Sequence, residues 1–108
     1  MKRPEECVII NDIRNEIDAV DKQVIELLGK RLQYVKEIVR FKKDEEDILA
    51  RERYKEVLAA RRDWADKHGL NPDVIEKMYI MLIQFFIEVQ KDTLKARLAD
   101  KKSPDPIA

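Results

Sequence analysis

The side chains that supply most protein nucleophiles and soft metal ligands are scarce in this sequence. It has one cysteine, one histidine, one serine and one threonine, namely Cys7, His68, Ser103 and Thr93. A Ser-His-Asp or Cys-His catalytic device would need isolated or tail-end residues. A structural zinc site of four Cys and His ligands cannot form within one chain. A lone cysteine also excludes an intrachain disulfide and is typical of reducing compartments.

Long hydrophobic runs are also missing. The longest apolar stretch includes Tyr79 to Ile87 and contains Gln84, and it is far shorter than the ~20 residues that a membrane helix needs. The apolar run at residues 7–10 is too short for a signal peptide. We therefore expect a soluble, cytoplasmic protein that does not bind a membrane.

Glycine and proline are few, and neither sign of charge is in excess. The 108 residues include two glycines and four prolines, and 22 basic side chains balance 22 acidic ones. Charged residues make up 41% of the chain, against roughly 25% in typical globular domains. This composition favours one all-α domain of long helices with salt-bridged outer faces. Zero net charge argues against general binding of nucleic acid.

Apolar residues recur at steps of three and four, which is the helical period. Asn11 or Asp12 can cap the first helix, Gly69 can stop the second, and Asn71-Pro72 can start the third. The domain is expected to cover residues 1–100. Its predicted segments are helices at about 12–42, 50–68 and 71–98, a loop at 43–47 and a disordered tail at 101–108.

The first predicted helix is too long for a compact monomer. About 31 residues at 1.5 Å each give a length of roughly 46 Å, whereas a compact 100-residue domain has a radius of gyration near 13 Å. The helix therefore cannot bury its whole apolar stripe against its own chain. We expect two chains to associate into an intertwined, homodimeric helical bundle.

Three donor-rich side chains interrupt the apolar stripes. Arg31 and Lys42 would share one face of the first helix, about 16 Å apart along its axis. Gln90 occupies the next apolar position of the third helix. Buried polar groups need partners, so these residues suggest an anionic, oxygen-rich ligand. The alternative is that the two cations lie along an apolar face with their charged ends in water.

Arg14 is a further candidate with a geometric constraint. It lies about 25 Å from Arg31 along the same helix, so the two cannot hold one small ligand from the same chain. Either Arg14 reaches the ligand from a partner chain, or it is an ordinary surface residue of the first turn.

Several segments resemble the all-helical chorismate mutase superfamily, and together they span about residues 1–97. In order they are Pro4-Glu5-Glu6-Cys7, Asp12-Ile13-Arg14, Leu28-Gly29-Lys30-Arg31, Arg40-Phe41-Lys42, Glu52-Arg53, Arg62-Asp63-Trp64-Ala65 and Gln90. The branch they are most similar to is the isochorismate-pyruvate lyases of salicylate and siderophore biosynthesis. The resemblance implies an intertwined homodimer of three-helix chains with two equivalent active sites, no cofactor and no metal.

The resemblance also implies a role for each polar candidate. Arg31 and the partner subunit's Arg14 would bind the two carboxylates of the substrate. Lys42 and Gln90 would donate to the ether oxygen of its enolpyruvyl group. The only small-molecule partner implied is a dicarboxylate, either isochorismate or chorismate.

Residues 51–53 and Phe86 bear on the choice between these substrates. Glu52 and Arg53 would act at the ring hydroxyl and the edge of the site. Arg51-Glu52 resembles the true mutases, in which both residues contact the substrate. Phe86 is large and apolar where such mutases often place a small hydroxyl residue, which favours the lyase branch.

The implied activity is pericyclic catalysis, which needs no nucleophile. The lyase reaction eliminates pyruvate from isochorismate to give salicylate. The first alternative is chorismate mutase activity, from chorismate to prephenate, in the same site. The second is a non-catalytic helical module for dimerisation or regulation.

Overall fold

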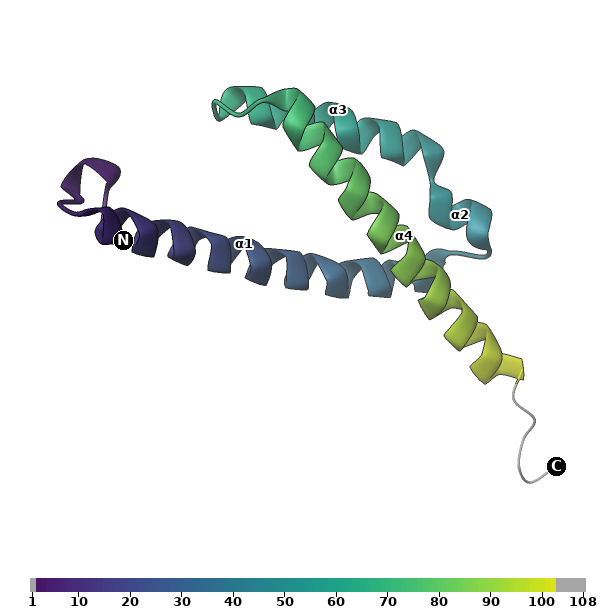
Figure 1. The fold of residues 1–108 in the computed structure, drawn as a ribbon. Coiled ribbons are helices and arrows are strands. Elements are labelled where there is room, and N and C mark those ends of the chain that lie inside the picture. The colour runs from purple at the N-terminus through teal and green to yellow at the C-terminus, as the bar shows by residue number, and fades with distance from the viewer. Residues whose placement is uncertain (1, 103–108) are drawn as a thin grey trace. The chain divides into compact units, whose positions relative to one another are not determined.

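The structure, a computed structural model, describes residues 2–102, and the all-α prediction is confirmed there, since no strand occurs in this range. The chain divides into two units after Tyr34, which are described in turn. The three long helices are α1 (Ile10–Ile38), α3 (Arg51–Lys67) and α4 (Pro72–Lys102) (Figure 1). The short elements are η1 (Pro4–Glu6), η2 (Val39–Phe41) and α2 (Glu45–Leu49).

In the first unit, one carboxylate holds the start of α1. Asp12 accepts hydrogen bonds from the backbone N–H groups of Val8, at 2.9 Å, and Ile9, at 3.3 Å. Its other oxygen lies 3.6 Å from the Lys2 ammonium. Helix α1 begins at Ile10, slightly earlier than predicted. Asp12 therefore acts from inside the first turn, where it supplies acceptors for N–H groups that the helix itself cannot satisfy.

These contacts make the stability of the chain depend on pH. Hydrogen bonds from Val8 and Ile9, helped by the charge of Lys2, hold the pKa of Asp12 below its ordinary value of 3.8. Such a carboxylate stabilises the folded chain above the unfolded-state pKa, and this stabilisation is lost as the pH falls through the folded-state pKa. We therefore expect Asp12→Asn to cost more stability at about pH 6 than at about pH 3. Urea unfolding of the wild type and Asp12→Asn at both pH values measures this cost. An equal loss of unfolding free energy at the two pH values would contradict the proposed role of the Asp12 carboxylate.

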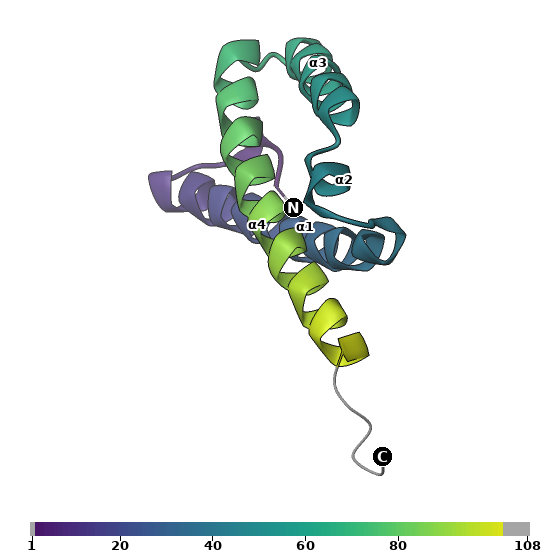
Figure 2. The ribbon, with the colours of Figure 1, turned by 90° about the vertical axis from the view of Figure 1, so that its right-hand side faces the viewer.

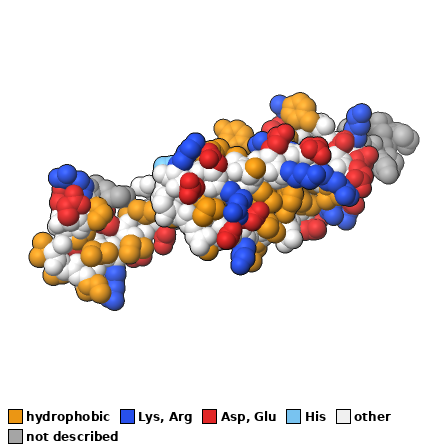
Figure 3. Space-filling view, turned by 90° about the horizontal axis from the view of Figure 1, so that it is seen from above, with side chains coloured by type: hydrophobic (Ala, Val, Ile, Leu, Met, Phe, Trp, Pro, Cys, Tyr) orange, Lys and Arg blue, Asp and Glu red, His pale blue; other side chains and the backbone are white. Residues whose placement is uncertain are grey.

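Helix α1 buries none of its residues. An apolar groove of about 320 Å³ lies beside its stripe, with Pro4 and Cys7 on the side of the N-terminal segment. On the face shown in Figure 3, hydrophobic side chains are exposed between acidic and basic ones. Within the first unit the stripe therefore stays uncovered. Its residues, each about half exposed, are Ile13, Ile17, Val20 and Val24.

In the second unit, α3 and α4 form a hairpin and lie side by side in both ribbon views (Figure 1, Figure 2). The predicted stop and start are confirmed at the turn between them. Gly69 has a positive φ of 72°, and the Leu70 N–H donates to the Ala65 carbonyl at 2.8 Å, as in glycine-terminated helices. Asn71 then caps α4 by accepting the Asp73 N–H at 2.9 Å.

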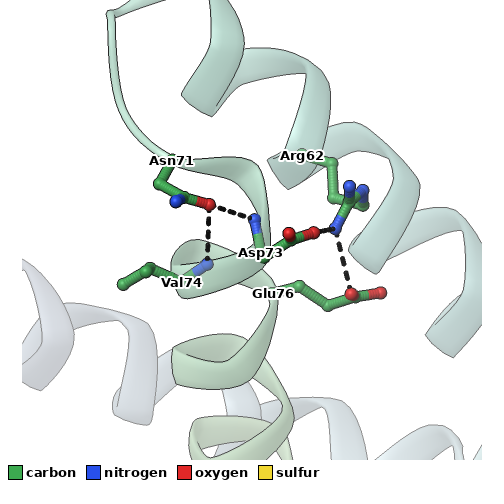
Figure 4. A network of polar contacts seen from close by, with 5 residues as sticks. All are labelled: Arg62, Asn71, Asp73, Val74 and Glu76. Atoms are coloured by element: carbon green, nitrogen blue, oxygen red, sulfur yellow. Dashed lines mark hydrogen bonds and ion pairs between the residues drawn. The ribbon is translucent and has the colours of Figure 1, made fainter.

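An arginine bridges the two helices of this hairpin (Figure 4). One guanidinium nitrogen of Arg62, on α3, lies 2.9 Å from Asp73 and 3.0 Å from Glu76, both in the first turns of α4. The hydrogen bond to Asp73 and the charge of Glu76 raise the pKa of Arg62 above its ordinary value. Both carboxylates therefore favour the charged form of the guanidinium.

The core of the second unit attaches the segment between α1 and α3 to α4. Val39 of η2 is 1% exposed and Ile48 of α2 is 3% exposed, and both pack with Leu94 of α4, beside Ile87. Residues 40–47 lie between these two anchors. Both ends of that segment are thus fixed on the same stretch of α4.

The predicted end of the first helix is wrong. Helix α1 ends at Ile38, and the chain then makes the tighter turn of η2. Lys42 follows in an extended conformation, with φ of −102° and ψ of 135°, and its N–H donates to the Val39 carbonyl at 2.9 Å. The burial of Val39 explains the change, because the chain turns there to reach the core.

The predicted loop at 43–47 is also wrong, since α2 begins at Glu45. The helix forms because the Asp44 carboxylate caps it, accepting the Asp47 N–H at 3.0 Å. Ala50 separates α2 from α3 with a positive φ of 42°, a conformation that costs a non-glycine residue about 1–2 kcal/mol.

The predicted tail begins too early. Residues 101 and 102 complete α4, and the rest of the tail, residues 103–108, lies outside the described residues. None of the helices between residues 2 and 102 combines the length and apolar content of a membrane span.

Candidate active site

Lys42 is half-buried, and its side chain has a definite partner. Its Nζ donates to the main-chain carbonyl of Asp47 at 2.9 Å. Because its backbone N–H is bonded to Val39, which is buried, the lysine belongs to a segment anchored on the core. An ammonium has three N–H donors. One of them bonds the Asp47 carbonyl, so two remain for a ligand.

Gln90 lies on the stretch of α4 that receives this segment. It is half-buried, four residues after the buried Phe86 and four before the buried Leu94. Residues spaced by four share one face of a helix, so the predicted inward position of Gln90 is confirmed. Lys42 follows Val39 by three residues and Gln90 precedes Leu94 by four, and Val39 and Leu94 pack in one core cluster.

Residues 51–53 open α3 and are exposed. Glu52 and Arg53 form ion pairs with residues one turn further along α3, at 3.9 Å and 3.7 Å. Exposed pairs of this kind are weak, so a ligand can readily displace them. Between residues 51–53 and either Lys42 or Gln90, all within the described chain, there is no hydrogen bond or ion pair.

Arg14 and Arg31 belong to the first unit. Arg14 is exposed and Arg31 is half-buried. Both lie on the continuous helix α1, so their separation of roughly 25 Å follows from helical geometry. The predicted common helical face of Arg31 and Lys42 is wrong, because α1 ends at Ile38 and its period does not extend further.

Asp47 contributes to this region, and the prediction of a loop at 43–47 did not single it out. Its carbonyl holds the Lys42 ammonium, and its carboxylate accepts the Lys43 backbone N–H at 2.9 Å. A signal was present in the sequence. Asp44 is one of the residue types that favour the N-cap of a helix, and acidic residues follow it in what becomes the first turn.

The second unit offers hydrogen-bond donors rather than metal ligands. Within residues 2–102, no group of three or more His, Cys, Asp and Glu side chains is placed to hold a metal ion. An ammonium and an amide N–H, as on Lys42 and Gln90, can stabilise negative charge on a ligand oxygen.

Comparison with known proteins places the sequence of this chain in a family. The family described as chorismate mutase type II matches residues 13–91, a range that includes every candidate site residue. The chain is 39% identical over 90 residues to the isochorismate pyruvate lyase of Pseudomonas aeruginosa. That match covers 83% of this chain and 89% of the lyase.

Shorter matches occur to two larger proteins. The T-protein of Haemophilus influenzae is 40% identical over 68 residues, and that of Enterobacter agglomerans is 42% identical over 65 residues. They cover 62% and 59% of this chain, but only 18% and 17% of the T-proteins. By the extent of the family match and of the match to the lyase, the chain belongs to the chorismate mutase type II family of enzymes.

Proposed function

We propose that this protein is an isochorismate pyruvate lyase, which eliminates pyruvate from isochorismate to give salicylate. The observation that supports this most is the 39% identity to the Pseudomonas aeruginosa lyase, because it extends over 83% of this chain and 89% of that protein. We further propose that the enzyme acts in the cytoplasm and supplies salicylate for siderophore synthesis.

Two arginines are proposed to bind the carboxylates of isochorismate. Arg31 binds one of them, and Arg14 of the partner subunit binds the other, because the two arginines of one chain are too far apart. The uncovered apolar stripe of α1 supports the intertwined homodimer that this requires. Its burial would contribute about 25 cal/mol per Å² of apolar surface, part of which offsets the entropy lost on association.

Lys42 and Gln90 are proposed to donate hydrogen bonds to the ether oxygen of the enolpyruvyl group. The reaction breaks the allylic C–O bond while the hydrogen on the hydroxyl-bearing ring carbon moves to the methylene carbon of the enolpyruvyl group, which gives pyruvate and the aromatic ring. Negative charge grows on the ether oxygen as the C–O bond breaks. Donors held there bind the transition state more tightly than the ground state. The elimination is pericyclic and needs no nucleophile, in keeping with the scarcity of cysteine, histidine and serine.

Chorismate mutase activity in the same site is the second candidate. The family match supports it, as does Arg51-Glu52, a pair that resembles the mutases. Phe86 supports the lyase instead, since a bulky apolar ring that is 4% exposed stands where mutases often have a small hydroxyl residue. Glu52 and Arg53 are proposed to meet the ring hydroxyl and the edge of the site with either substrate.

One experiment ranks the candidates. The purified protein is given isochorismate and chorismate separately, and salicylate fluorescence and chorismate loss are followed. The lyase predicts salicylate formation with a much higher kcat/KM than prephenate formation. The reverse ranking would make the protein a mutase, and no turnover of either substrate would favour the non-catalytic module.

A further inference from the structure

Asp47 bonds to the residues just before it through its carbonyl oxygen, one carboxylate oxygen and its N–H. Its carbonyl oxygen accepts the Lys42 ammonium at 2.9 Å, and its carboxylate accepts the Lys43 N–H at 2.9 Å. Its own N–H donates to the Asp44 carboxylate at 3.0 Å. These bonds close residues 42–47 into a compact turn, which we call the Asp47 turn.

The two ends of the Asp47 turn are fixed, whereas its middle is exposed. Val39, which accepts the Lys42 N–H, is buried against α4, and so is Ile48, the residue after Asp47. Residues 43–46 are exposed. An exposed segment between two anchors needs internal bonds to keep one shape. The Asp47 carboxylate supplies one of the bonds that join the backbone of this segment to α2, and the Ile48 N–H, which donates to the Asp44 carbonyl at 3.4 Å, supplies another.

The carbonyl bond also orders a flexible side chain. A lysine side chain has many rotamers, and confining it to one of them costs conformational entropy. With one N–H directed to Asp47, the Lys42 ammonium has a defined place before any ligand arrives. Donors that need no rearrangement during the reaction are the most effective ones.

We propose that Asp47 is a positioning residue for Lys42. Its carboxylate closes the Asp47 turn, and its carbonyl oxygen then directs the Lys42 ammonium toward the ether oxygen of the substrate. The inference rests on the proposed function. Asp47 acts through Lys42, because its own carboxylate is engaged by the Lys43 backbone.

The test compares Asp47→Ala and Asp47→Asn with a matched change in the same short helix. Asp47→Ala should lower kcat for isochorismate about tenfold or more and change KM less than about twofold, since Lys42 acts mainly in the transition state. Asp47→Asn keeps an oxygen acceptor for the Lys43 N–H and should restore most of kcat. Glu46→Ala removes an exposed carboxylate outside the turn's bonds and should leave kcat unchanged.

Two kinetic results would overturn the proposal. One is a wild-type kcat for Asp47→Ala. The other is an equal loss for Asp47→Ala and Glu46→Ala, which would assign the effect to the charge of α2 instead. Far-UV circular dichroism and urea midpoints establish that each variant is folded.

Amide hydrogen exchange tests the Asp47 turn without any reaction. In the ligand-free protein, the Lys43 backbone amide hydrogen should exchange faster in Asp47→Ala than in the wild type. Its exchange rate in Glu46→Ala should equal that of the wild type. Unchanged exchange at Lys43 would refute the turn. Failure of the wild type to convert either substrate would instead refute the proposed function, so the two failures are distinguishable.

Discussion

Lys42→Ala is expected to lower kcat for isochorismate by about 10²–10³-fold, which corresponds to the ~3–4 kcal/mol that one such donor can supply. The lost charge acts on an oxygen that becomes negative only as the C–O bond breaks, so KM should change much less. In the folded chain the variant removes one exposed bond, to the Asp47 carbonyl. Circular dichroism and the unfolding midpoint should therefore stay close to wild type, and steady-state kinetics at saturating isochorismate measure the loss.

Lys43→Ala is the matched control for this variant. Lys43 is the next residue, has the same charge and is exposed. Its bond to Asp47 uses the backbone N–H, which alanine keeps. Its kcat should stay within about twofold of wild type, because its exposed side chain takes no part in the proposed site. A wild-type rate for Lys42→Ala would show that the ammonium does not stabilise the transition state.

Leu94→Ala is expected to have the largest effect on stability. Leu94 is 7% exposed and packs with Val39 and Ile48. The cavity left by its truncation should lower the free energy of unfolding by about 2–5 kcal/mol, a large share of the 5–15 kcal/mol typical of a domain. Urea unfolding at one fixed protein concentration measures this, because association makes stability depend on concentration. The variant also loosens the support of the segment that carries Lys42, so kcat should fall while the chain is still folded.

Leu98→Ala, one turn further along α4, is the matched control for Leu94→Ala. It distinguishes the loss of the contact with Val39 and Ile48 from the loss of any leucine side chain on α4. Leu98 is 39% exposed, so its truncation should cost less than about 1 kcal/mol. If Leu94→Ala and Leu98→Ala lowered the free energy of unfolding equally, the packing of Leu94 against Val39 and Ile48 would not be the anchoring contact. A destabilised Leu94→Ala with a wild-type kcat would show that Lys42 does not depend on it.

The three long helices could be predicted because each carries an apolar stripe with the helical period, and Asn71-Pro72 marks the start of the third by its capping chemistry. Helix α2 could not, because its five residues are too few to show a period. The feature that marks its start is the capping residue Asp44, which accepts the Asp47 N–H. A prediction from the spacing of apolar residues does not use capping residues. The end of α1 was misplaced because Val39 continues the apolar pattern after the chain has left the α-helix.

The candidate site could be predicted only in part. Gln90 was found because a polar residue inside an apolar stripe is visible from its position alone. Lys42 was found in the same way, but its geometry was wrong because the ideal helix was extended through η2. Glu52 and Arg53 came from the resemblance, and no periodic pattern reveals that they pair along α3. The role of Arg14 needs a second chain and stays a proposal.

The anchoring of the Asp47 turn at both ends bears on how this fold can diverge. The side chains at positions 43, 45 and 46 are exposed, so substitutions there leave the folded state nearly as stable as before. Val39 and Ile48, by contrast, are constrained by packing. Variation can therefore accumulate beside Lys42 while the fold is preserved. Selection for a new substrate would draw first on this short surface segment and only later on the long helices.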